Sequence, residues 1–131
     1  MKLNKVLSIT VSIVVLSAWS IKLNQPSIFR GGNATNMSEE FATYGLDEST
    51  MIIVGVCKVL LSILLLLGAL KYSRFIQPAA AILGLFMMGA VYFHISIGDG
   101  VVPTLAAASM LLICLVLTFY PNISLSSSQK I

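Results

Sequence analysis

Four long apolar runs limit what this chain can fold into. They extend from Leu3 to Leu23, Met51 to Leu70, Pro78 to Ile97 and Pro103 to Tyr120. Each has about the 20 residues that a helix needs to cross the hydrocarbon core of a bilayer. Hydrophobic residues make up 57% of the sequence and charged residues only 10%, whereas roughly a quarter of a soluble domain is charged. The sequence therefore predicts an all-α integral membrane protein, a single antiparallel four-helix bundle over residues 1–131.

The longest polar segment, residues 24–50, joins the first two runs and carries the pattern of one more helix. Ser38 is a suitable N-cap, and two acidic residues follow it in the first turn. Apolar side chains recur here at helical spacing, namely Met37, Phe41 and Tyr44. Gly45 suits the end of this helix, and Asp47 or Ser49 suits the start of the second span. We expect a short interfacial helix that lies on the mouth of the bundle.

The first run also has the basic start and apolar core of a signal peptide. It continues through Trp19 to Leu23, however, and Leu16-Ser17-Ala18 is a poor cleavage site. We therefore expect the first run to be a retained helix.

The basic residues predict the orientation of the chain. Five of them flank the runs on one side: Lys2, Lys5, Lys71, Arg74 and Lys130. Arg30 alone lies in the loop on the other side. Because cytoplasmic loops are enriched in Lys and Arg, we expect both termini and the polar tail 121–131 in the cytoplasm, and the protein in a bacterial cytoplasmic membrane. No basic stripe with interleaved aromatic residues is present, so nucleic acid is not an expected partner.

Cysteine and histidine are too sparse to indicate a metal site or a thiol redox centre. Cys57 and Cys114 lie in different apolar runs and form no CxxC pair, and His94 is the one histidine. Buried cysteines act as small hydrophobic side chains, and a metal site built by one chain needs more ligands than these. We expect neither kind of site.

Five polar residues converge on the end of the bundle that carries the 24–50 loop. Because antiparallel runs alternate in direction, this end gathers Lys22, Lys58, His94, Ser96 and Asp99. A lysine in mid-span costs about 2.5–3.5 kcal/mol, so Lys58 either extends its ammonium group to the interface or binds a partner in a polar pocket. His94 either closes the mouth of the bundle, bonded to Asp99 or to a backbone carbonyl, or contributes to that pocket. We predict a pocket of these five residues, in which loop acids or an anionic ligand offset the repulsion between the lysines.

Several short motifs, spread in order over nearly the whole chain, carry a family resemblance. They are Ile-Lys-Leu at 21–23, Phe-Ala-Thr-Tyr-Gly-Leu at 41–46, Gly55, Gly-Ala-Val-Tyr-Phe-His at 89–94 and Ile-Gly-Asp at 97–99. On these motifs the chain resembles the DoxX-like membrane proteins, which include the animal chaperones that assist nicotinic receptor assembly. The resemblance implies a four-helix bundle that belongs to a larger membrane system, linked in some members to quinone or oxidative-stress chemistry and in others to protein assembly.

The chain departs from the family pattern at two places. A small or Gly pair usually precedes the first-span Lys, where this chain has Trp19 and Ser20. The family's Gly-x-x-Glu on the second span is Gly55-Val-Cys-Lys58 here. If the usual Glu pairs with the first-span Lys, that pair is absent and the pocket has become cationic. Any function that depends on that carboxylate does not transfer to this chain.

Three functions fit the sequence. The first is a non-enzymatic accessory or assembly subunit, because no set of nucleophile, base and orienting residue is present. The second is a membrane subunit of a quinone-linked or oxidative-stress redox complex, with His94 and Lys58 donating hydrogen bonds to a quinone or anionic substrate. The third is a small transporter that works as a homo-oligomer. The expected partners are the lipid bilayer and another membrane protein or a second copy; no cofactor is predicted, and quinone is the one considered.

Overall fold

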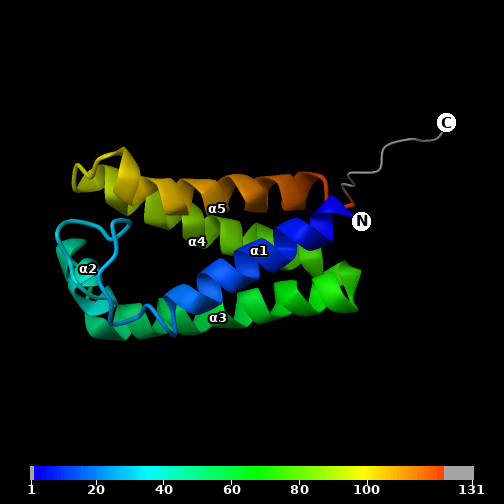
Figure 1. Cartoon of the computed structure of the whole chain (residues 1–131), viewed down its shortest axis with the longest axis horizontal. Coiled ribbons are helices and arrows are strands. Elements are labelled where there is room, and N and C mark those ends of the chain that lie inside the picture. The colour runs from blue at the N-terminus through cyan, green and yellow to red at the C-terminus, as the bar shows by residue number, and fades with distance from the viewer. Residues whose placement is uncertain (1, 123–131) are drawn as a thin grey trace.

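The computed structural model describes residues 2–122, and every regular element in this range is helical (Figure 1). The elements are α1 (Leu3–Ala18), α2 (Met37–Thr43), α3 (Glu48–Leu70), the 3-10 turn η1 (Ser73–Phe75), α4 (Ile76–Ser96) and α5 (Val101–Phe119). Within the described range, three segments are long and apolar enough to cross a membrane: α3, η1 with α4, and α5. α1 is apolar but shorter. The chain is therefore an all-α membrane protein.

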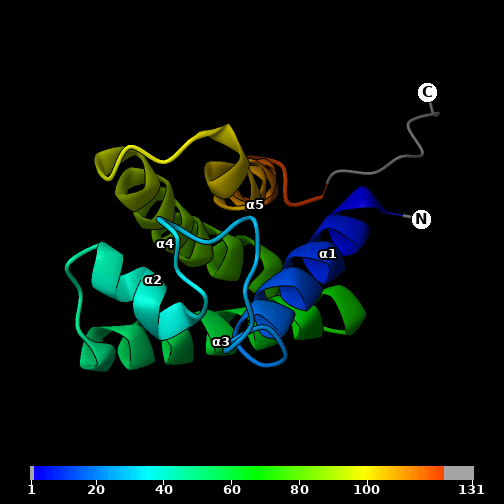
Figure 2. The same ribbon diagram turned by 60° about the vertical axis from the view of Figure 1, so that its left-hand side comes forward.

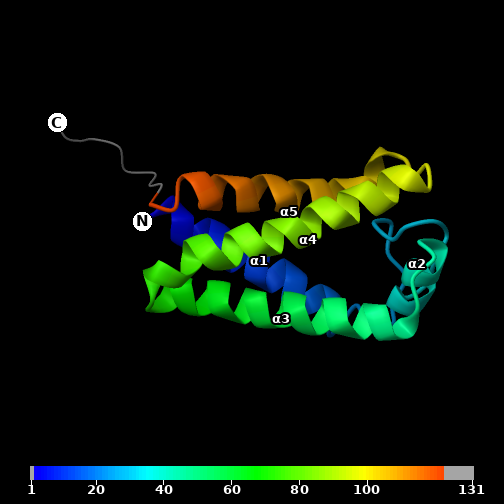
Figure 3. The same ribbon diagram turned by 180° about the vertical axis from the view of Figure 1, so that it is seen from behind.

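The helices α1, α3, α4 and α5 run lengthwise, and α2 lies at one end of them (Figure 1 and Figure 3). α4 packs on α5, α1 packs on α3, and α3 also contacts α4. We call the end with α2 and the α4–α5 turn the α2 end. The opposite end holds the start of α1, the α3–α4 turn and the end of α5, and we call it the Lys71 end. There the side-chain amide of Asn4 donates to the Pro121 carbonyl at 2.6 Å, which joins α1 to the segment that follows α5.

The core of the protein lies between the four long helices, away from α2. Its fully buried members come from all four long helices: Val11, Leu65, Ile76, Ala80, Leu83, Cys114 and Leu117. The hydroxyl of Ser12 donates to the Ser62 carbonyl at 2.9 Å, so α1 and α3 approach within a direct hydrogen bond. Gly68 permits a similar approach at the α3–α4 turn, because a Cβ there would lie 2.9 Å from Cγ1 of Ile76. Small residues thus close the Lys71 end.

The observed helix ends differ from the expected ones for local reasons. α1 ends at Ala18, short of Leu23, because the chain turns back and the Lys22 amide donates to the Ser17 carbonyl at 2.9 Å. α3 begins at Glu48, since the Asp47 carboxylate caps it by accepting from the Thr50 amide at 2.9 Å. α4 begins at Ile76 because η1 leads directly into it. α5 covers Val101–Phe119 rather than 103–120, and residues 123–131 of the expected tail lie outside the described range.

α2 occupies the position expected for the short loop helix, with its apolar side turned inward. Its N-cap is Asn36 rather than Ser38, and the Asn36 side chain accepts from the Glu39 amide at 2.8 Å. Met37 and Phe41 are buried, and the chain leaves the helix at Gly45 with φ +79°. Figure 2, turned toward this end, shows α2 and the preceding loop lying over the ends of the long helices.

Candidate functional site

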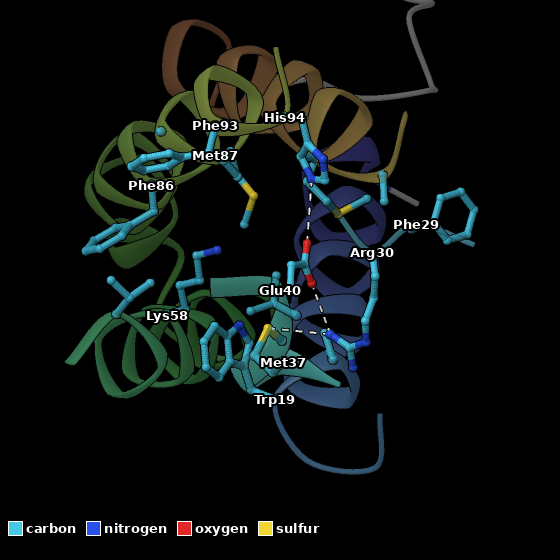
Figure 4. A pocket seen from close by; sticks show the side chains of 18 of the residues that line it. Trp19, Phe29, Arg30, Met37, Glu40, Lys58, Phe86, Met87, Phe93 and His94 are labelled. Carbon is cyan, nitrogen blue, oxygen red and sulfur yellow. Dashed lines mark hydrogen bonds and ion pairs between the residues drawn. The ribbon is translucent and has the colours of Figure 1, made fainter. Parts of the chain in front are cut away.

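A cavity of about 620 Å³ lies at the α2 end and is lined by residues of all five α-helices and of the loop before α2 (Figure 4). Cavities of roughly 300–1,000 Å³ with apolar walls and a few polar groups are typical of small-molecule sites. The walls are largely apolar and include Val15, Phe41, Ile82, Phe86, Met87 and Met110. The charged residues on the wall are Lys22, Arg30, Glu40 and Lys58. The cavity thus combines a large apolar surface with a small polar group of residues.

Glu40, from α2, is the centre of the polar cluster. Its carboxylate is buried, and both of its oxygens accept hydrogen bonds. Oε1 lies 3.1 Å from Nη1 of Arg30. Oε2 accepts from the Gly31 amide at 3.0 Å and from the Tyr44 hydroxyl at 2.8 Å. The carboxylate therefore fastens the loop to α2.

Arg30 is buried at the same place, with 7% of its surface exposed. Besides its ion pair with Glu40, its guanidinium donates to three backbone carbonyls. Nε donates to the Gln25 carbonyl at 2.8 Å, and Nη2 donates to the carbonyls of Lys22 and Leu23. Such multiple pairing is what a buried arginine requires. Arg30 therefore holds the turn after α1 in shape and has little capacity left for a ligand.

His94, near the end of α4, connects this cluster to the α4–α5 turn. Its Nδ1 lies 2.7 Å from Oδ2 of Asp99, and its Nε2 lies 3.3 Å from the Tyr44 hydroxyl and 3.8 Å from Oε2 of Glu40. The other Asp99 oxygen accepts from the Gly32 amide at 3.0 Å. These contacts form one continuous path from the cavity wall at Glu40 to the turn at Asp99.

Tyr44 is the middle member of that path. Its burial, reinforced by the nearby Glu40 carboxylate, raises the pKa of the Tyr44 hydroxyl well above the usual range. The hydroxyl therefore stays protonated and donates to Glu40. The ring stacks on Phe93 at a centroid distance of 5.2 Å, which fixes the position of the hydroxyl.

Lys58 projects into the cavity from α3, on the wall formed with Trp19 (Figure 4). Its Nζ lies 5.7 Å from the centre of the Trp19 ring, within the range of a cation–π interaction. Gly55, one turn before Lys58, makes this possible because a Cβ there would lie 2.5 Å from the Trp19 ring. Among the described residues, Lys58 forms no salt bridge.

The structure places the five residues of the predicted pocket in different surroundings. His94 and Asp99 are in direct contact, and Lys58 and His94 line the same cavity. Lys22 borders the cavity, but its side chain is exposed and its contact with the cluster is through its carbonyl oxygen. Ser96 is exposed and donates to the Phe93 carbonyl at 2.8 Å, away from the cluster.

Three cluster residues were not part of the predicted pocket: Arg30, Glu40 and Tyr44. Glu40 had a usable signal, because it shares the helical face of Met37 and Tyr44, which points inward. An acid on an apolar face requires a buried partner. Arg30 gave no such signal, since its position depends on how an irregular loop folds back.

The described residues include no group of three His, Cys, Asp or Glu side chains placed to hold a metal ion. What the site offers a ligand is the Lys58 ammonium, the His94–Tyr44–Glu40 hydrogen-bond path and apolar walls.

Comparison with known protein families identifies the chain. The model of the DoxX-like family matches residues 6–119, from the first turn of α1 to the end of α5. The chain belongs to the DoxX-like family. The resemblance found in the sequence motifs is therefore confirmed, over a range that includes every residue of the cavity wall. No curated protein and no solved structure matches this DoxX-like chain significantly.

Proposed function

We propose that this DoxX-like protein crosses the bilayer four times and binds a lipophilic small molecule in the cavity at its α2 end. The fourth span is α1, whose 16 residues correspond to about 24 Å of helix. The turns through Leu23 extend the same apolar run. With the basic residues flanking the Lys71 end in the cytoplasm, the cavity lies in the half of the membrane that faces away from it.

The cavity itself is the observation that carries this proposal. It is lined by residues of all five α-helices, and its walls are largely apolar. Two wall residues on α4, Ile82 and Leu85, are also exposed to the outside, at 48% and 64%. The cavity is thus bounded by side chains that face the bilayer, which provides an entry route for a molecule dissolved in the membrane.

The test is to identify lipids that co-purify with the protein and to block the cavity. A molecule enriched over the bulk membrane lipid, at near stoichiometric amount, is expected in the wild type. Ala107→Trp, on the cavity wall, should remove it. Leu112→Trp, on the exposed face of the same helix, should retain it. Equal lipid content in both variants and the wild type would contradict the proposal.

A redox role is the second candidate, and the His94–Tyr44–Glu40 path favours it. A quinone gains or loses protons with its electrons, and the path from Glu40 to Asp99 consists of groups that can pass a proton. If this role is correct, the enriched lipid is a quinone, and His94→Ala lowers its content. A non-quinone lipid unaffected by His94→Ala would exclude the role.

An accessory or assembly role stays a proposal, and fewer features of the structure support it than support ligand binding. The small residues of α4 that suited close packing against another protein are used inside this chain: Ala79, Ala80 and Gly84 are buried, and a Cβ at Gly84 would lie 3.4 Å from Cys114. A partner would therefore contact the large apolar side chains of the exterior. Co-purification of a stoichiometric membrane protein in mild detergent is the test.

A further inference from the structure

We propose that the cavity selects an amphiphile with a single negative charge, such as a long-chain carboxylate, and that Lys58 binds its head group. This inference rests on the proposed function and specifies the class of ligand. It begins from the charges on the cavity wall. Three basic residues line the cavity, and Glu40 is the one acidic residue among its lining side chains in the described range.

The other charges on the wall are already paired or face water. Arg30 is bound to Glu40 and to backbone carbonyls, and Glu40 receives hydrogen bonds at both oxygens. The Lys22 side chain is exposed. Lys58 alone presents a charge to the cavity with no carboxylate within salt-bridge distance in the described residues.

The Trp19 ring beside Lys58 does not neutralise this charge. A cation–π contact stabilises an ammonium group but leaves its three N–H donors free. A lysine in an apolar, membrane-embedded wall is unfavourable unless it binds an acceptor. A carboxylate is the strongest acceptor for it, because charge-assisted hydrogen bonds are about twice as strong as neutral ones.

The apolar lining of the cavity indicates what the ligand has besides its head group. Beyond Lys58, the wall continues over apolar side chains of three helices, among them Val54, Phe86 and Met110. A head group at Lys58 leaves these surfaces for an alkyl chain. The exposed wall residues Ile82 and Leu85 mark the side from which a membrane lipid enters. A neutral quinone would fill the same apolar space but would leave the Lys58 charge unpaired.

Trp19 makes the inference directly testable, because it is the single tryptophan of the chain and lies on the cavity wall. The full chain in phosphatidylcholine nanodiscs is titrated with 9,10-dibromostearate and, separately, with its methyl ester. Bromine quenches tryptophan on contact, and the two probes differ only in charge. We expect saturable quenching by the acid at a concentration at least about tenfold lower than by the ester, the ratio for one charged hydrogen bond.

Substitutions then assign the selectivity to one side chain. Lys58→Met should abolish the difference between the two probes, and Lys58→Arg should retain it. Lys71→Met is the matched control, because Lys71 also lies over an aromatic ring, that of Tyr72 at 5.4 Å, but at the opposite end. It should leave the quenching unchanged.

The outcomes separate the inference from the proposed function. Equal, saturable quenching by acid and ester in the wild type would overturn the anionic ligand while leaving a lipophilic one in place. A preference for the acid that survives Lys58→Met would overturn the role of Lys58. Quenching that rises without saturation for both probes would remove the cavity site altogether.

Discussion

The long helices of this protein are packed differently at its two ends. At the Lys71 end, small residues and fully buried aliphatic side chains bring the helices into direct contact. At the α2 end, the same helices surround a cavity of about 620 Å³, and charged and polar side chains form part of its lining. The difference shows that close apolar packing holds the long helices together toward the Lys71 end. The α2 end can therefore contain a cavity.

The Arg30–Glu40 ion pair joins α2 to the loop that precedes it. Removing this pair should have the largest effect on stability. Glu40→Ala leaves Arg30 buried without its partner, which typically costs about 3–5 kcal/mol. Unfolding in detergent by denaturant measures the loss. Glu39→Ala is the control, because the exposed Glu39 carboxylate bonds only to the adjacent Thr35. Similar losses in both variants would mean that the α2 end is not fastened by this pair.

The same substitution at two glycines should distinguish the ends. Gly68→Ala places a Cβ 2.9 Å from Ile76 Cγ1 and 3.1 Å from its backbone nitrogen, an overpacking that costs about 1–3 kcal/mol. Gly89→Ala, on the cavity wall, meets no atom within 4 Å and should gain up to about 1 kcal/mol of helix stability. Thermal unfolding of the two variants measures this contrast. Equal shifts would show that the ends do not differ in packing.

Alkaline pH should weaken the α2 end through Tyr44. The pKa of its hydroxyl is raised in the folded protein, so the folded state binds this proton more tightly than the unfolded chain, whose tyrosine titrates near pH 10. The resulting stability is complete below about pH 10 and declines above it. Tyr44→Phe removes this component and costs about 1 kcal/mol at neutral pH. Stability measured between about pH 8 and pH 11 should fall more steeply for the wild type than for Tyr44→Phe; parallel curves would exclude the effect.

The smallest effect is expected at Ser96. Its hydroxyl is exposed and bonds only to the Phe93 carbonyl, so Ser96→Ala should change stability by less than about 0.5 kcal/mol. Its co-purified lipid should match that of the wild type. A loss of bound lipid on this substitution would show that Ser96 contributes to the site.

The sequence predicted the parts of this molecule that depend on local pattern. Hydropathy identified the apolar helices, and the spacing of Met37, Phe41 and Tyr44 identified α2. The placement of Lys58 and His94 toward the same end followed from alternating helix direction, and both residues line the cavity.

The rest depends on contacts between residues distant in the sequence. The turn after α1 is held by Arg30, which donates hydrogen bonds to the carbonyls of Lys22 and Leu23. Glu40 and Asp99 receive backbone amides from the loop at Gly31 and Gly32. The periodicity of the sequence does not predict such contacts, because the loop that makes them is irregular. The cavity itself depends on α3 and α4, which lie close together at the Lys71 end and diverge toward the α2 end (Figure 3).

The most direct test of an open α2 end and a closed Lys71 end compares two thiols on one helix. In a Cys57→Ser, Ala107→Cys chain, α5 carries an introduced thiol on the cavity wall and the native Cys114, which is fully buried. The folded protein in nanodiscs is treated with N-ethylmaleimide, and mass spectrometry locates the label. We predict modification at position 107 and none at Cys114 until the protein is unfolded. Equal protection of both thiols, or equal labelling, would contradict the account.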